Sequence, residues 1–485
     1  MDSIHKTITE GTLATQNLLD SLAIELAVDV IRQIKEQNIE TIRVLFADQH
    51  GILRGKTIVA SKLVSIFQSG MAAPSTLLLK DSAHKTVFPV WSTEASAAGE
   101  LVGACDVLMV PDPSTFRQLP WSPHSAWLMC DLHYKSGAMI PFAPRTVLKH
   151  AIEKLQANNK ALVVGLEVEF HVFELVEPKR EHKDATMPGQ AVLTRNLTQG
   201  YQFLTETRYD QLEDIMDTLR RHCIELGLPV TSMEIEMGPS QFEFTFDPMD
   251  PMTHADNMIM FRTMVKEVCA RQGLHATFMC CPNLENAAAS GWHLHQSLVD
   301  SRSGVNLMMP STGQTLTAEG GHWIAGLLEH AAACTLLTTP TVNGYKRYRP
   351  HQLAPDRIQW GKDNRGAMIR ALMNCEDSAS RIENRVAEPA ANPYYFFASQ
   401  ILSGLDGLNR QLVAPEPVDT PYDNAAPKLP TSLISAVDAF EGSEFIRREF
   451  GEAFLAYLGA IHRSEWDRYH QTVSDWEQNE YFNLY

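Results

Sequence analysis

Four short segments of the chain alternate ionisable or polar side chains with apolar ones. They span residues 166–170 (LEVEF), 241–246 (QFEFTF), 292–298 (WHLHQSL) and 381–386 (RIENRV). Because successive side chains of a β-strand point to opposite faces, residues two apart lie on the same face. If each segment is a strand, its apolar residues form a core face. The opposite faces then carry Glu167 and Glu169; Gln241, Glu243 and Thr245; His293, His295 and Ser297; and Arg381, Glu383 and Arg385.

Ordinary half-exposed antiparallel strands show the same alternation, but their polar faces usually carry Lys, Thr and Ser. Clustered carboxylates repel one another unless a cation neutralises them. Oxygen ligands with a single imidazole suit Mg²⁺ or Mn²⁺ better than Zn²⁺. Arginines bind phosphate and carboxylate oxygens. Together these residue types predict phosphoryl transfer from ATP. The chain has no G-x-x-x-x-G-K-[ST] loop, so the nucleotide must be bound in another way.

The N-terminal part, residues 1–137, is predicted to be a small sheet-rich domain. Its first 35 or so residues carry one helical pattern. Residues 41–48 and 53–59 are predicted strands, joined by a turn at residues 49–51 (QHG).

Residues 138–485 are predicted to form a larger domain in which helices alternate with polar-faced strands. Its first helix is expected over residues 146–155, after two prolines. Residues 176–200 are expected to be an exposed insertion and residues 413–431 a proline-rich surface excursion, and the tail from Leu433 is expected to be mostly helical.

Composition and charge exclude several classes of protein. The net charge of -17 argues against a nucleic-acid partner bound through its phosphates. The eight cysteines include no C-x-x-C pair, which indicates reduced, mostly buried thiols in a cytoplasmic protein. No secretory signal and no apolar run of membrane-spanning length is present, so no membrane association is expected.

In this order, the segments resemble the glutamine synthetase family, and the match runs from about residue 40 to the C-terminus. The motifs that carry the resemblance are GLEVEF (165–170), EMGPSQFEF (236–244), SGWHLHQSL (290–298), NGYKRYRP (343–350), DNRGAMIR (363–370) and RIENRVAEPAANPYYFFASQILSGLDGL (381–408). The resemblance implies an α+β fold, with a small N-terminal β-grasp-like domain and a large catalytic domain whose curved antiparallel sheet is flanked by helices. It also implies ring assemblies, usually dodecamers of two stacked hexamers, with each active site between two subunits.

The resemblance further implies which residues bind metal and ATP. Glu169, Glu236 and Glu243 correspond to ligands of the metal on the glutamate side, whereas Glu234 is at most an indirect contributor. The metal that bridges the ATP phosphates corresponds to Glu167, His293 and Glu383. Two to three Mg²⁺ or Mn²⁺ ions are expected in each site. His295 and Ser297 are expected to contact the nucleotide, and Arg365, Arg370 and Arg381 the phosphates.

The implied reaction is ATP-dependent ligation of the glutamate γ-carboxylate to a primary amine through γ-glutamyl phosphate, a γ-glutamylation suited to amine catabolism. Arg347 corresponds to the arginine that binds the glutamate α-carboxylate, and Arg385 to the arginine near the γ-carboxylate. Arg347, Arg365 and Arg385 are therefore the expected catalytic residues.

The amine site departs from the family. The family places a flap Glu six residues after the glutamate-binding arginine, where this chain has Leu353, and an Asp loop where residues 70–76 (GMAAPST) have no acid. An Asn-Gly-Ser-Gly run is altered as well, and the expected substrate-pocket residues are Ala289, Gly291, Trp292 and Leu353 beside Arg347 and Arg385. An apolar lining disfavours ammonium and favours an amine with a hydrocarbon body, such as aniline or a short alkylamine.

Three alternatives remain. A polyamine substrate would need an acid for its distal ammonium, for which Asp81, Glu94 and Glu100 are candidates. Ordinary glutamine synthesis would need a shifted flap, with its acid within residues 356–363. A non-catalytic structural relative is disfavoured because all six expected ligands and all five arginines are present. Tyr422 stands near a tyrosine that some bacterial relatives adenylylate, but its surroundings match poorly and favour an ordinary loop tyrosine.

Overall fold

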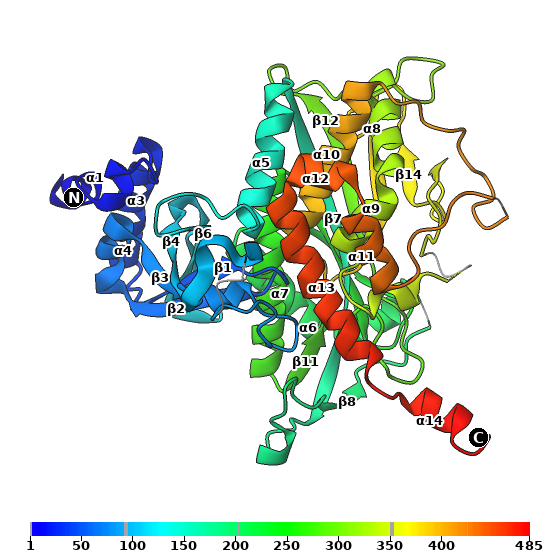
Figure 1. The fold of residues 1–485 in the computed structure, drawn as a ribbon, viewed down its shortest axis with the longest axis horizontal. Helices are drawn as coiled ribbons and strands as arrows, with labels where there is room; N and C mark the ends of the chain where they lie inside the picture. The colour runs from blue at the N-terminus through cyan, green and yellow to red at the C-terminus, as the bar shows by residue number, and fades with distance from the viewer. Residues whose placement is uncertain (1, 92–95, 202, 350–353, 424) are drawn as a thin grey trace.

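The computed structural model describes residues 2–91, 96–201, 203–349, 354–423 and 425–485. Two β-sheets organise them (Figure 1): a smaller one in the N-terminal part, at the left of the view, and a larger one at the centre of the molecule. This is the mixed helix-and-sheet architecture expected from the sequence.

Three helices precede the smaller sheet: α1 (Asp2–Thr9), α2 (Thr12–Thr15) and α3 (Ser21–Glu36). The single helical pattern predicted for this region is therefore wrong. The helical conformation is interrupted near Asn17, which has a left-handed φ of 57°, and the next helix begins after Asp20. The Asp20 side chain accepts a hydrogen bond from the Ala23 N–H and so caps α3.

The smaller sheet has the strand order β2-β1-β6-β4-β3, with β5 paired to β6. As predicted, the first two strands form a hairpin around Gly51, whose φ is +67°. The pair β1–β6 is parallel. The elements are β1 (Thr41–Ala47), β2 (Leu53–Val59), α4 (Leu63–Ser69), β3 (Met71–Pro74), β4 (Asp106–Pro111), β5 (Arg117–Leu119) and β6 (Ser122–His133).

The larger sheet has the order β13-β14-β15-β12-β7-β10-β9, with β8 and β11 also paired to β7. It is antiparallel except for the pair β13–β14. All four segments singled out in the sequence are strands of this sheet, which confirms the prediction. Its strands are β7 (Lys160–Glu177), β8 (Leu193–Asn196), β9 (Val230–Ile235), β10 (Gln241–Met249), β11 (Leu274–Thr277), β12 (Trp292–Asp300), β13 (Trp360–Lys362), β14 (Ile369–Leu372) and β15 (Arg381–Ala387).

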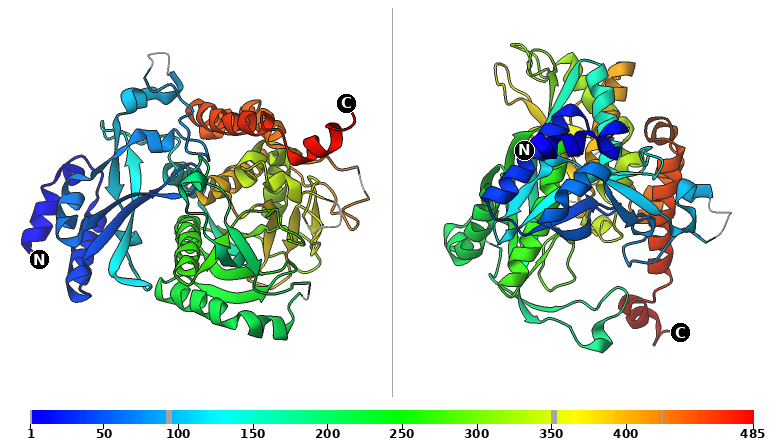
Figure 2. Two further views of the ribbon diagram at one scale, coloured as in Figure 1. Left: turned by 90° about the horizontal axis from the view of Figure 1, so that it is seen from below. Right: turned by 90° about the vertical axis from the view of Figure 1, so that its left-hand side faces the viewer.

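Helices cover the apolar face of the larger sheet. Phe170 of β7 and Phe244 of β10 pack against Phe261 of α7, and all three are buried. Figure 2 shows helices lying beside the sheet. The helices of this part are α5 (Pro144–Ala157), α6 (Glu206–Glu225), α7 (Pro251–Arg271), α8 (Ala318–Glu329), α9 (Ala331–Thr338) and α10 (Pro393–Arg410).

The described residues of the segment 413–431 are irregular, and the tail is helical, as predicted. The tail helices are α11 (Leu433–Glu441), α12 (Glu444–Phe450), α13 (Glu452–His470) and α14 (Asp475–Tyr481), and α14 projects from the body of the molecule (Figure 1). The predicted insertion at 176–200 is mostly exposed, and its strand β8 pairs with β7.

Side-chain contacts fix the smaller sheet against the larger part. Asn392, at the start of α10, donates hydrogen bonds to the Asp48 and Gln49 carbonyls, each at 3.1 Å. Buried Arg145 of α5 binds carboxylates from both parts, including Asp112 and Asp256, each at 2.9 Å. The eight cysteines are free thiols. Among the described helices, none combines the length and apolar character needed to cross a bilayer.

Candidate active site

The strand register places the ionisable side chains in rows across the sheet. Glu169 of β7 lies opposite Glu243 of β10, which lies opposite Glu234 of β9. In the next row, Glu167 lies opposite both Thr245 and His293. Directly paired residues share a face. The polar side chains of the separate strands therefore form one polar surface on one face of the sheet.

Glu169, Glu236 and Glu243 form the first acidic cluster, in which one oxygen atom from each lies within 4.8 Å of the others. Burial and the neighbouring carboxylates raise the pKa of Glu243 to about 11. Burial and the charge of Glu236 likewise raise the pKa of Glu169 to about 8. Three carboxylates held this closely are a strongly attractive site for a cation.

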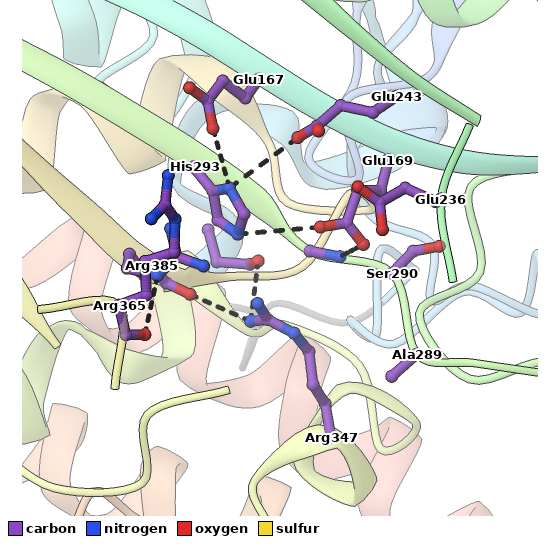
Figure 3. A network of polar contacts seen from close by, with 12 residues as sticks. Glu167, Glu169, Glu236, Glu243, Ala289, Ser290, His293, Arg347, Arg365 and Arg385 are labelled. Carbon is purple, nitrogen blue, oxygen red and sulfur yellow. Dashed lines mark hydrogen bonds and ion pairs between the residues drawn. The ribbon is translucent and has the colours of Figure 1, made fainter. Parts of the chain in front are cut away.

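His293 lies between this cluster and a second one. Its Nδ1 is 3.1 Å from Glu167 and 3.6 Å from Glu383, and its Nε2 is 3.7 Å from Glu169 (Figure 3). Burial and the charge of Arg385 lower the pKa of His293 to about 4. Its imidazole is therefore neutral at pH 7, the form that can coordinate a metal.

The second cluster includes a residue that the sequence did not assign to metal. Glu167, His295 and Glu383 also offer ligand atoms within 4.8 Å of one another. His295 Nε2 lies 2.8 Å from Glu167 Oε1, and its Nδ1 accepts a hydrogen bond from Arg381. The alternation on β12 was the available signal, because it already placed His293 and His295 on the same face. All six expected ligands thus lie around one site.

The arginines surround these clusters. Arg385 and Arg370 both pair with Glu383, the latter at 3.0 Å, and Arg370 also pairs with Asp363. Arg347 is buried and donates to the backbone carbonyls of Arg385, Val386 and Ala387. Exposed Arg365 contributes its carbonyl, which accepts a hydrogen bond from Arg385.

Gly291 makes room for Arg347. A Cβ added at Gly291 would lie 2.3 Å from Arg347 Nη2, so any side chain there would displace the guanidinium. The Gly291 N–H donates to Glu169 at 2.9 Å. Neighbouring Ala289 is exposed beside these groups (Figure 3).

Gln241 is a supporting residue that the sequence pattern placed on the polar face without giving it a role. Its Nε2 lies within hydrogen-bond distance of Glu169, the Ala289 carbonyl and Ser290 Oγ, at 3.2, 3.1 and 3.0 Å. Gln241 therefore joins the first acidic cluster to the segment that carries Ala289 and Gly291.

Trp292 and Leu353 are the remaining residues predicted to line the amine pocket. The expectation that Trp292 lines this pocket is wrong, because its indole is fully buried against Phe396 and Phe397 of α10. The alternation that exposes His293 to the site turns Trp292 to the core face. Leu353 lies outside the described residues.

A cavity of about 700 Å³ adjoins the second cluster. Glu167, His295, Ser297 and Arg381 line it, together with apolar Val163, Phe246 and Met309. This size is within the usual range for cavities that bind small molecules. Ser297 Oγ donates to the Ser380 carbonyl at 2.9 Å.

Comparison with known proteins agrees with this geometry. Residues 141–481 match the family model described as glutamine synthetase, catalytic domain. The chain belongs to the glutamine synthetase family. It is 39% identical to a gamma-glutamylanilide synthase of Acinetobacter sp. over 98% of both chains. It is 30% identical to a gamma-glutamylethanolamide synthetase of Streptomyces coelicolor, with 91% of this chain and 92% of that one covered.

Solved structures of the glutamine synthetase family share the fold. The structure titled "Apo GmaS without ligand" matches with a TM-score of 0.79 and 27% identity, over 94% of this chain and all of the other. The curved antiparallel sheet and the α+β fold class are thereby confirmed. Like its relatives, the chain is an ATP-dependent ligase.

The two clusters fit the divalent metals that glutamine synthetase family ligases use. Glu243 Oε1 is buried and has no hydrogen-bond partner among the described residues, so it is a free ligand atom. The donors are carboxylates and imidazoles, which suit Mg²⁺ or Mn²⁺. A divalent ion bound here would neutralise negative charge on phosphoryl oxygens.

Proposed function

We propose that this ligase joins the γ-carboxylate of glutamate to a primary amine with a hydrocarbon body, either aromatic, such as aniline, or a short alkylamine. The observation that carries the proposal is the shared polar face. It brings the two metal-type clusters, Arg347 and the nucleotide-sized cavity together.

A carboxylate is a poor electrophile because an amine would have to expel oxide. Transfer of the ATP γ-phosphoryl group to glutamate forms γ-glutamyl phosphate, from which phosphate can leave. The amine nitrogen then forms the new C–N bond, the C–O bond to phosphate breaks and the nitrogen loses a proton. In this proposal Arg347 and Arg385 would hold the glutamate carboxylates, and Arg365, Arg370 and Arg381 would bind phosphoryl oxygens.

The proposed Mg²⁺ or Mn²⁺ ligands form two sets. Glu169, Glu236 and Glu243 would hold the ion on the glutamate side. Glu167, His293 and Glu383 would hold the ion on the ATP side, since His293 Nδ1 lies 3.1 Å from Glu167 and 3.6 Å from Glu383. Glu167, His295 and Ser297 line the adjoining cavity.

The preference for a hydrophobic amine is supported by the relatives and by the lining. The 39% identical relative is named for an anilide, and a 28% identical relative from Pseudomonas sp. is named glutamate–isopropylamine ligase. Ala289 presents an exposed methyl group, and the sequence has Leu353 where the family has its flap Glu, whereas an ammonium site needs charge. An aromatic amine is already neutral at pH 7 and needs no carboxylate base before attack.

Three of the acids that the alternatives need, Asp81, Asp356 and Asp363, already lie beside cationic side chains, whereas Glu100 is exposed and accepts a hydrogen bond from Ser136. For a polyamine, Asp81 is buried and accepts a hydrogen bond from Arg468, while Glu94 lies outside the described residues. For ammonium, Asp363 pairs with Arg370, and Asp356 lies 4.0 Å from the cationic groups of Arg357 and Lys428. Neither observation favours an ammonium or diamine site.

The test is phosphate release from ATP with glutamate fixed and an amine panel: ammonium, ethylamine, isopropylamine, aniline, putrescine and ethanolamine. We expect a hydrophobic amine to exceed ammonium in kcat/KM by at least about tenfold, the usual worth of a filled apolar pocket. If ammonium were the best substrate, the proposed preference for hydrophobic amines would be wrong. If putrescine were the best substrate, the enzyme would instead be a polyamine ligase. No turnover by protein that binds Mg²⁺ would favour a structural role.

A companion variant is Leu353→Glu, with Leu353→Gln as its uncharged control. We expect only Leu353→Glu to raise ammonium use and to weaken use of a bulky amine. No gain with ammonium would argue against Leu353 facing the amine.

We also propose that the chain assembles into rings, with a dodecamer as the expected form. The support is the family membership and the exposed Trp476, Phe482 and Leu484 near the C-terminus, which leave apolar surface uncovered on a single chain. Sedimentation of the purified protein as a monomer would contradict this.

A further inference from the structure

Cys280 and Cys281 are adjacent in the sequence and close in space. They lie in the loop between β11 and β12, and their sulfur atoms are 3.8 Å apart. Cys280 is buried, whereas Cys281 is half-buried. Nothing in the proposed reaction uses either thiol.

Cys280 holds the segment that reaches the first acidic cluster. The Ser290 N–H donates to the Cys280 carbonyl at 2.8 Å, and the Cys280 thiol donates to the Ser290 carbonyl at 3.2 Å. The next residue, Gly291, donates to Glu169. Movement of Cys280 would therefore be transmitted to a proposed metal ligand.

Cys281 holds the segment that leads to Arg347. Its N–H donates to Asn343 Oδ1 at 2.7 Å, and Asn343 Nδ2 donates to its carbonyl at 2.9 Å. Asn343 immediately precedes the short helix Gly344–Arg347. The two cysteines therefore connect both walls around the proposed glutamate site.

The surroundings also make Cys281 the more reactive thiol. Contact with Cys280 lowers the pKa of Cys281, and the positive charges of Arg347, Arg349 and Lys346 lower it further against the opposing effect of burial. Contact with Cys281 and burial raise the pKa of Cys280. The pair thus has an attacking thiolate and a neighbouring thiol that can resolve its oxidised form.

We propose that Cys280 and Cys281 form a vicinal dithiol modification site, which peroxides convert to a disulfide that weakens glutamate binding. The Cys281 thiolate attacks one oxygen of hydrogen peroxide, and the O–O bond of the peroxide breaks. Hydroxide departs, and Cys281 becomes a sulfenic acid. The Cys280 sulfur then attacks this sulfur, the S–O bond breaks and water carries away the Cys280 proton. The two thiols lose two electrons and the peroxide gains them.

The disulfide would disturb both walls. Its sulfur atoms must approach from 3.8 Å to about 2 Å, and the thiol hydrogen bond to the Ser290 carbonyl is lost. We expect KM for glutamate to rise about two- to tenfold, as for loss of one hydrogen bond, and KM for ATP to change less. This readout rests on the proposed function, whereas the covalent change does not.

The experiment exposes the full-length protein to hydrogen peroxide in a chelator, which prevents metal-catalysed damage to the ligands, and then restores Mg²⁺. We expect the tryptic peptide 272–302 to lose two hydrogen atoms and KM for glutamate to rise, with dithiothreitol reversing both. Cys281→Ser and Cys280→Ser should abolish the mass change. Cys375→Ser, which removes an exposed thiol elsewhere, should leave it intact.

Phenylarsine oxide gives an independent test, because its arsenic binds two adjacent thiols and releases water. We expect binding that a dithiol reverses and that either single variant abolishes. The proposal is overturned if the peptide keeps its hydrogens, or if Cys281→Ser loses activity to peroxide as the wild type does. It is also overturned if dithiothreitol fails to reverse the loss, as for oxidation of Met279 to the sulfoxide. Failure of every amine in the activity panel would overturn the proposed function while leaving the peptide and arsenical results interpretable.

Discussion

The two ends of the active site are built differently. At the metal end, Glu167, Glu169 and Glu243 stand on strands whose backbone ladder fixes the position of each side chain. At the proposed amine end, Ala289 lies in the loop between β11 and β12, which has no ladder of its own. The strand register can therefore be kept, together with the phosphoryl-transfer chemistry that depends on it. Substitutions in the connecting segments can meanwhile change which amine is used. In the proposed site, shared chemistry and divergent specificity therefore have separate structural supports.

The largest expected effect tests the metal end. Glu243→Gln removes one carboxylate of the first acidic cluster, and we expect kcat/KM to fall at least about a hundredfold. The same change removes the cost of keeping this carboxyl protonated in the metal-free fold, so its thermal midpoint in chelator should rise. Amine-dependent phosphate release and thermal melts with and without Mg²⁺ measure both effects.

Glu234→Gln is the matched control, because Glu234 pairs in register with Glu243 but belongs to neither metal-type cluster. It should retain most activity and the stabilisation by Mg²⁺. Equal losses in the two variants would show that location on the polar face, rather than membership of the cluster, determines activity.

A smaller effect is the pH dependence of metal binding. The pKa values of Glu169 and Glu243 are raised to about 8 and about 11, whereas these carboxyls have a pKa of 4.5 when unperturbed. The metal-free fold keeps protons that the unfolded chain releases, so this contribution destabilises the fold as pH rises from 4.5 through about 8. Metal binding must displace the protons, so metal affinity should increase with pH.

Thermal melts between about pH 6 and pH 8.5, with Mg²⁺ or with chelator, measure this linkage. We expect the gap between the two midpoints to widen as pH rises, and calorimetry to detect proton release on metal binding. A gap independent of pH would show that the clustered carboxylates are already ionised without metal.

The sequence predicted which side chains share a face at the metal end because that signal is local. A period-two pattern places Glu167 and Glu169, or His293 and His295, on one face of a strand without knowledge of the fold. The order of strands across the sheet is not local, so the resemblance to a known family had to bring the rows together. Contact of His295 with Glu167 and the bridging role of Gln241 depend on that strand order.

The N-terminal helices and the amine end were harder to predict. The break at Asn17 depends on a left-handed residue that helical periodicity does not detect. Ala289 and Leu353 were placed by counting from neighbouring motifs, because connecting segments have no repeating pattern. The same counting placed Trp292 in the pocket, although the alternation on its own strand turns it to the core.

Trp292→Phe gives the smallest expected effect and separates the two ends most sharply. The indole of Trp292 packs edge-on against Phe396 and Phe397, with ring centroids 5.2 and 5.7 Å away. Truncation should lower the thermal midpoint through a loss of about 1–2 kcal/mol of packing and leave the ratio of amine to ammonium use unchanged. The contrasting variant is Ala289→Gly, which should alter glutamate or amine kinetics with little change in the midpoint. A shifted amine preference in Trp292→Phe would instead mean that the core face of β12 influences the amine, and that the two ends are not independent.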